Sequence, residues 1–112
     1  MKRFVITILN NDDSLKSAQR CIESGSSFGY SIKTFKATTS KDDPVDLANY
    51  YNIPIKGFLN NQYSRFENVL SCFLSHYRVW KCCEEIDEEC LILEHDAILK
   101  RHLPTDEYDE CL

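Results

Sequence analysis

At 112 residues the chain has room for one small domain, which excludes a two-domain organisation. Hydrophobic residues make up 43% of the chain, which is enough for a packed core and excludes a disordered ground state. The net charge of -5 excludes nonspecific nucleic-acid binding, because nothing would offset the repulsion of the phosphates.

The amino-terminal sequence does not predict a targeting or membrane-spanning segment. Lys2 and Arg3 precede an apolar run at residues 4–9, and polar residues 10–13 end that run. Six apolar residues are too few for the core of a signal peptide and far too few to span a bilayer. We therefore predict a cytoplasmic protein.

Six cysteines in a short chain raise the question of a disulfide framework. Those that fall inside helical patterns are Cys21, Cys72, Cys82 and Cys83. Cys90 opens a predicted strand, whereas disulfide-rich mini-domains are rich in loops and poor in core. We predict that the cysteines are reduced and pack as small apolar side chains.

The amino-terminal part of the chain predicts a strand, a helix and a second strand. Residues 4–9 form a run of β-branched and apolar side chains, typical of a central parallel strand that is buried on both faces. Residues 10–14 supply several candidate N-caps for a helix that Gly25 is expected to end. Residues 30–35 are rich in β-formers and complete a parallel βαβ unit.

A loop region is predicted at residues 37–63, with a short helix at 45–51. A long helix follows, which begins at a capping box of Ser64 and Glu67 and runs to about Glu85. Its predicted apolar stripe consists of Phe66, Val69, Leu70, Phe73, Tyr77 and Trp80. On this wheel Ser75 lies nearly opposite the stripe, and His76 lies on its flank.

An acidic step follows the third predicted strand, residues 90–93. Glu94 and Asp96 stand just past its carboxyl end, where ligands bind in open α/β sheets. If the chain stays extended, alternation places both carboxylates on one side and turns His95 away. The pair is then either a holder for Mg²⁺ or Mn²⁺ carrying a diphosphate, or two solvated acids.

Two further polar residues have both a binding and a structural interpretation. His76 is either a ligand contact near the cleft or a packed, hydrogen-bonded histidine beside the core. Asn10, at the end of the first strand, either contacts a nucleotide or serves as an ordinary cap. A small zinc module is a further alternative, although no C-x-x-C pair is present; its candidate ligands are Cys72, His76, Cys82, Cys83, Cys90 and His95.

Two linked motifs resemble those of glycosyltransferase family 25. They are Cys72-x-Leu74-Ser75-His76-x-x-x-Trp80 and Leu91-Ile92-Leu93-Glu94-x-Asp96. The family includes lipopolysaccharide and lipooligosaccharide biosynthesis enzymes and collagen galactosyltransferases. The first strand with Asn10 is also similar to the family's opening strand.

The resemblance implies a GT-A-like (Rossmann-like), three-layer α/β fold with a mostly parallel sheet, forming one nucleotide-sugar-binding domain over residues 1–112. It implies a hexosyltransferase that moves a sugar from a UDP-sugar, often UDP-galactose, to a hydroxyl of a saccharide or glycoprotein. By the match, Glu94 and Asp96 hold the divalent cation, Mn²⁺ or Mg²⁺, while Asn10 and His76 lie at the nucleotide-sugar.

Three departures from the family's pattern qualify that expectation. His95 stands where the family usually has an acid, and acids stand at Asp12 and Asp13 where the family has arginines. Family members are also longer, which implies that the acceptor side and any general base lie beyond Leu112, so no catalytic residue is assigned. A non-catalytic binding or interaction domain derived from this fold is therefore the alternative function.

Overall fold

The computed structural model describes residues 1–58 and 65–101, which contain three strands, three α-helices and two 3₁₀ turns. In chain order they are β1 (Lys2–Thr7), α1 (Asp12–Ser26), β2 (Lys33–Lys36), the 3₁₀ turn η1 (Ser40–Asp42), α2 (Pro44–Tyr50), the 3₁₀ turn η2 (Lys56–Phe58), α3 (Phe66–Ile86) and β3 (Cys90–Glu94). The predicted strands and helices are thus all present, with boundaries shifted by a few residues. No helix in these ranges has the length and apolar character needed to cross a membrane.

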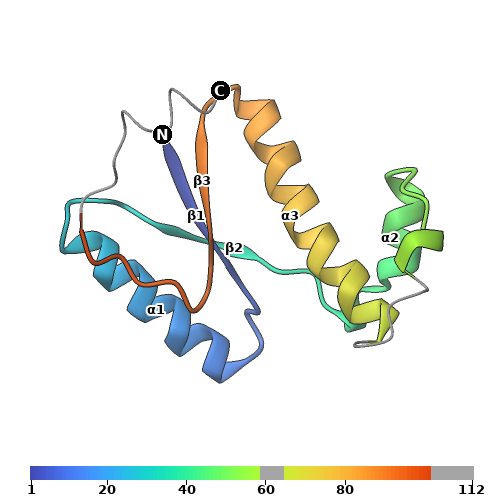
Figure 1. The fold of residues 1–112 in the computed structure, drawn as a ribbon, viewed down its shortest axis with the longest axis horizontal. Coiled ribbons are helices and arrows are strands. Elements are labelled where there is room, and N and C mark those ends of the chain that lie inside the picture. The colour runs from blue at the N-terminus through green and yellow to red at the C-terminus, as the bar shows by residue number, and fades with distance from the viewer. Residues whose placement is uncertain (59–64, 102–112) are drawn as a thin grey trace.

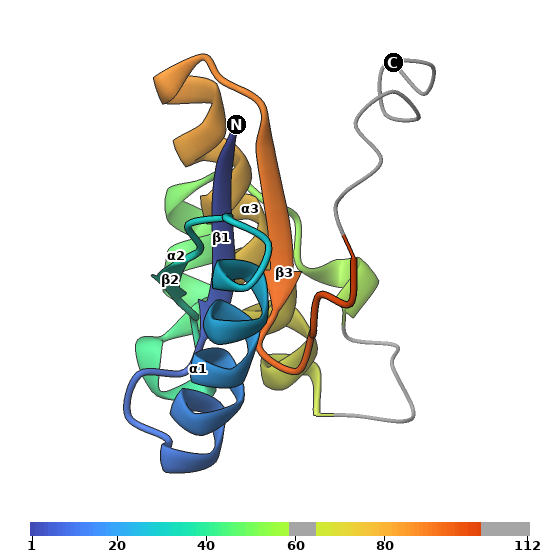
Figure 2. The ribbon, with the colours of Figure 1, turned by 90° about the vertical axis from the view of Figure 1, so that its left-hand side faces the viewer.

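The three strands form one parallel sheet with the order β2-β1-β3, so β1 is the central strand as predicted (Figure 1). Val5 packs with Ala18 and Cys21 of α1, whereas Ile6 packs with Val79 of α3. Because neighbouring residues of a strand face opposite sides, α1 and α3 cover opposite faces of the sheet. Figure 1 shows α1 and α3 on either side of the strands, and Figure 2, with α1 in front, shows the strands in this order; the three layers confirm the predicted α/β class.

Helix α1 begins as predicted, at one of the candidate caps. The Asn11 side chain accepts a hydrogen bond of 2.9 Å from the backbone N–H of Ser14. The expectation for Gly25 is wrong, because the helix continues to Ser26 and Gly25 lies inside it. Gly25 instead provides room for a neighbour, since a Cβ there would collide with the Ile32 side chain.

The apolar stripe predicted for α3 is wrong in its direction. The buried residues of this helix are Leu70, Ser71, Leu74, Ser75 and Val79, and Trp80 is 49% exposed. The reason is that α2 packs against the first half of α3, where Ala48, Leu70 and Leu74 form one buried cluster. The predicted cap Ser64 lies outside the described residues.

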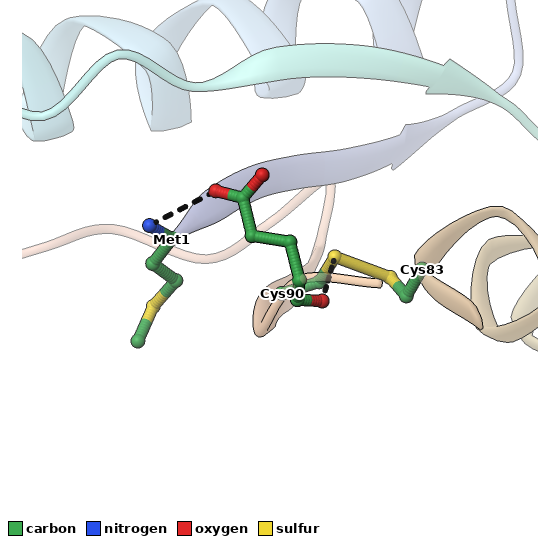
Figure 3. Close-up of a disulfide and its surroundings, with 4 residues drawn as sticks. Met1, Cys83 and Cys90 are labelled. Carbon is green, nitrogen blue, oxygen red and sulfur yellow. Dashed lines mark hydrogen bonds and ion pairs between the residues drawn. A yellow bond between two sulfur atoms is a disulfide. The ribbon is translucent and has the colours of Figure 1, made fainter. Parts of the chain in front are cut away.

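The prediction that every cysteine is reduced is wrong for two of them. Cys83 and Cys90 form a disulfide that joins the last turn of α3 to the first residue of β3 (Figure 3). Helix α3 ends at Asp87, whose φ is 51°, and the chain reverses there so that Cys90 returns beside Cys83. Beside the disulfide, the terminal amine of Met1 lies 3.2 Å from a carboxylate oxygen of Glu88.

Candidate functional site

The carboxyl ends of the three parallel strands lie along one edge of the sheet, at Thr7, Lys36 and Glu94. Two cavities open along this carboxyl edge. Cavity 1, of about 200 Å³, is lined by Ile6, Ile8, Ala37, Thr38, Cys72, Ser75, His76, Glu94 and His95. Cavity 2, of about 320 Å³, is lined by Ile8, Leu9, Asn10, Lys36, Ala37, Thr39, Lys41 and Asp42. The two cavities adjoin, because Ile8 and Ala37 line both.

His76 enters cavity 1 from α3, and its ring is fixed by its own helix. Nδ1 lies 3.1 Å from the carbonyl oxygen of Cys72, one turn earlier. A carbonyl oxygen only accepts hydrogen bonds, so Nδ1 carries the proton of the neutral ring and Nε2 keeps a lone pair. His76 can therefore accept a hydrogen bond or a proton at Nε2.

The segment after β3 turns instead of staying extended. The Ala97 N–H donates to the Glu94 carbonyl oxygen at 3.0 Å, which closes a turn with His95 and Asp96 in its centre. The expected alternation is therefore wrong, and His95 lines the same cavity as Glu94. Asp96 is exposed and does not line either cavity.

Ser14 joins the ends of the two neighbouring strands at this site. Its hydroxyl oxygen accepts the N–H of Ile8 at 2.9 Å and lies 3.2 Å from Nδ1 of His95. Since a hydroxyl has one proton and two lone pairs, the Ser14 hydroxyl can serve either tautomer of His95 in this second contact. Although Ser14 is a candidate cap in the sequence, nothing in its spacing indicates this contact with a residue 81 positions later.

The loop after β2 is held against α3 by hydrogen bonds that are buried or partly buried. The Ser75 hydroxyl oxygen accepts the N–H of Thr38 at 2.8 Å, and Nη1 of Arg78 donates to the Thr38 hydroxyl at 3.2 Å. Next to them, Asp42 accepts the backbone N–H of Thr39 at 2.8 Å. This bond is the main cause of a lowered pKa of Asp42, and the nearby charges of Lys36 and Arg78 lower it further.

A sequence model of glycosyltransferase family 25 (LPS biosynthesis protein) matches residues 1–110. The chain belongs to glycosyltransferase family 25. Membership supports a glycosyltransferase-like function, which requires a sugar donor and an acceptor. No individual curated protein gives a significant match to the chain.

Of the four residues that the family 25 resemblance assigns to the cation or the nucleotide-sugar, the fold brings two into one cavity. His76 and Glu94 both line cavity 1, and Asn10 lines the adjoining cavity 2. The carboxylates of Glu94 and Asp96 remain a predicted cation site at the edge of the sheet. Lys36 and Lys41, which the sequence did not single out, line cavity 2, and His95, which was expected to turn away, lines cavity 1.

The described part of this family 25 chain does not support the zinc alternative. Within residues 1–58 and 65–101, no group of three or more His, Cys, Asp or Glu side chains is placed to hold a metal ion. Cys83 and Cys90, two of the suggested ligands, are also bonded to each other. A cation here would have to rely on one or two carboxylates and on its ligand's oxygens.

Proposed function

We propose that the carboxyl edge of the sheet binds a nucleotide-sugar, a UDP-sugar such as UDP-galactose, as donor for transfer to a hydroxyl of a saccharide or glycoprotein. The observation that carries this proposal is the meeting of His76 and Glu94 in one cavity. The two residues come from the two family motifs, on α3 and β3. The carboxyl edge of a parallel sheet is also the usual place for nucleotide ligands.

In this proposal each polar group has a separate task. Nε2 of His76 accepts a hydrogen bond from the donor, since Nδ1 is held by Cys72. Ser14 fixes the ring of His95 and so keeps it in cavity 1. Asn10, with both an amide donor and a carbonyl acceptor, contacts the nucleotide from cavity 2.

Glu94 and Asp96 would hold a divalent cation, Mn²⁺ or Mg²⁺, beside the donor. Both carboxylates are exposed at the end of β3 or in the turn after it. The donor set fits such an ion, since Mg²⁺ commonly uses one or two carboxylates and takes its other ligands from water and phosphates. When bound, the cation would stabilise negative charge on the leaving diphosphate.

Thermal unfolding with UDP-sugars, with and without Mn²⁺, tests this function. Binding to the folded state alone raises the melting temperature, so UDP-galactose with Mn²⁺ should raise it for the natural chain. In the double variant Glu94→Ala/Asp96→Ala, the part of the melting-temperature shift that depends on Mn²⁺ should be lost. The control Glu85→Ala/Glu89→Ala removes two other exposed acids and should keep the metal-dependent shift.

Three outcomes count against the assignment. An unchanged metal-dependent shift in the Glu94/Asp96 variant would contradict the cation site. The absence of any shift with UDP-sugars would favour a non-catalytic interaction domain. Stoichiometric zinc in the purified protein would favour the zinc module.

A further inference from the structure

Cavity 2 collects positive charge at the carboxyl edge of a chain whose net charge is -5. Lys36 ends β2 and Lys41 lies in η1, and both side chains line this cavity. Within the described ranges neither lysine takes part in an ion pair, since the salt bridges there join Met1 to Glu88 and Lys81 to Glu84. Two cations without a carboxylate partner are available to an anionic ligand.

The acid in the same cavity, Asp42, offsets only part of this charge. One oxygen of Asp42 accepts both the N–H and the hydroxyl of Thr39, at 2.8 Å and 3.3 Å, and so belongs to the cap of η1. Lys36 and Arg78 both contribute to the lowered pKa of Asp42, which shows that their fields reach this position. The wall of cavity 2 therefore carries two ammonium groups and one carboxylate, which leaves it with a net positive charge.

The position of cavity 2 matches what a diphosphate would need. Its wall contains Ile8 and Ala37, which it shares with cavity 1, so the lysines and Glu94 lie on opposite sides of the end of β1. The outer strands of a three-stranded sheet are about 10 Å apart, which a nucleotide-sugar can span. A diphosphate centred over the end of β1 would therefore lie about 5 Å from either outer strand, within reach of the lysine side chains on one side and of a cation held by Glu94 on the other.

We propose that cavity 2 binds phosphate groups through the ammonium groups of Lys36 and Lys41, and that in the donor complex these are the diphosphate of the nucleotide-sugar. The second half of this statement rests on the proposed function. The first half concerns the cavity alone and applies to any ligand with a diphosphate. The amide of Asn10 adds an uncharged donor at the same cavity.

The test is a titration of the chain, without metal, with inorganic pyrophosphate, UDP and uridine. Pyrophosphate and UDP should bind and uridine should bind much more weakly. In the variant Lys36→Gln/Lys41→Gln, the affinity for UDP should fall about tenfold or more, because two charge-assisted contacts are lost. Added salt should lower the UDP affinity of the natural chain more than that of this variant.

The matched control is Lys2→Gln/Lys33→Gln, which lowers the net charge by the same amount. Both of these lysines line a cavity of about 190 Å³ at the opposite end of β1, together with Met1 and Arg3. The control should change UDP affinity no more than about twofold, since screening weakens distant charges. Equal losses in the two variants would show that only the overall charge matters and would overturn the phosphate site.

The remaining outcomes separate this inference from the proposed function. If the natural chain binds neither pyrophosphate nor UDP, the phosphate site is overturned. If UDP-galactose with Mn²⁺ stabilises Lys36→Gln/Lys41→Gln as well as the natural chain, the phosphate site fails and the proposed function stands. If pyrophosphate binds through the two lysines but no UDP-sugar binds, the phosphate site stands and the proposed function fails.

Discussion

The two faces of the sheet are covered in different ways, although neighbouring residues of β1 contribute a core side chain to each face. On the α1 face, Val5 meets the small side chains of Ala18 and Cys21, and burial raises the pKa of the Cys21 thiol. On the α3 face, Ile6 meets Val79, and towards the carboxyl edge this packing gives way to cavity 1. Close packing of small residues thus positions the sheet, while the face with buried serines and a cavity carries the candidate site.

The largest effect is expected on the α3 face, from loss of a buried hydrogen bond. Ser75→Ala removes the acceptor of the Thr38 N–H, and both residues are buried. An unpaired buried N–H costs about 1–3 kcal/mol, so the free energy of unfolding should fall by that amount in denaturant titrations.

Ser71→Ala is the matched control for Ser75→Ala. The Ser71 hydroxyl is buried one turn earlier and has no hydrogen-bond partner in the part of the chain that the structure describes. Its removal should leave stability unchanged or slightly higher, because an unsatisfied polar group is lost and alanine favours a helix. Equal losses for the two serines would contradict the assigned role of Ser75.

A smaller effect on the free energy of unfolding is expected on the α1 face, where the Ile32 side chain packs closely against Gly25. Gly25→Ala places a methyl group against the Ile32 and Leu99 side chains. Overpacking typically costs about 1–3 kcal/mol, and the higher helix propensity of alanine offsets about 1 kcal/mol of this. We expect a net loss of about 1 kcal/mol in the free energy of unfolding.

Gly57→Ala shows whether the effect at Gly25 is steric. Apart from its two chain neighbours, no heavy atom of residues 1–58 and 65–101 lies within 4 Å of a Cβ placed on Gly57. Its replacement should be neutral or stabilising by up to about 1 kcal/mol, through the reduced entropy of the unfolded chain. A gain in stability for Gly25→Ala as well would mean that Ile32 moves aside without cost, and that the α1 face is less tightly packed than described.

The smallest effect concerns the acid dependence of the loop beside α3. The pKa of Asp42 is lowered from 3.8, chiefly by the Thr39 N–H. A group with a lowered folded-state pKa adds stability above its unfolded pKa, and this is lost as the pH falls through the folded value. Asp42 is exposed, so solvent screening keeps the contribution below about 1 kcal/mol.

Unfolding titrations from about pH 5 to about pH 2 would detect this contribution. Asp42→Asn should reduce the loss of unfolding free energy as the pH falls, and should leave the rest of the pH dependence unchanged. An NMR titration that places the Asp42 pKa at or above 3.8 would contradict the described cap of η1.

The sequence was sufficient to predict the central strand of the sheet, but not which face of α3 is buried. The apolar run at residues 4–9 carries its own pattern, so the central strand was predictable. The orientation of α3 was not, because α2 and the loop after β2 cover the face with Ser71 and Ser75 and leave Trp80 half exposed. Hydrophobicity alone favours tryptophan over serine in a core.

The candidate site was predictable only where a motif named a residue. His76 and Glu94 were found in this way, and both line cavity 1. His95 was missed because the prediction assumed an extended chain, whereas the hydrogen bond from Ala97 to Glu94 turns it. The disulfide was missed because it depends on the reversal at Asp87, which periodicity does not reveal.

The register of the sheet also sets the order in which this domain can be completed during synthesis. Lys2 pairs with Cys90, so β1 is made before both of its neighbours and waits for β3 until nearly all the described chain has followed. Parallel pairing over such a separation forms slowly, and an open strand edge is a template for other strands. The edge of β1 that later receives β3 is therefore where a nascent chain is most exposed to pairing with another copy.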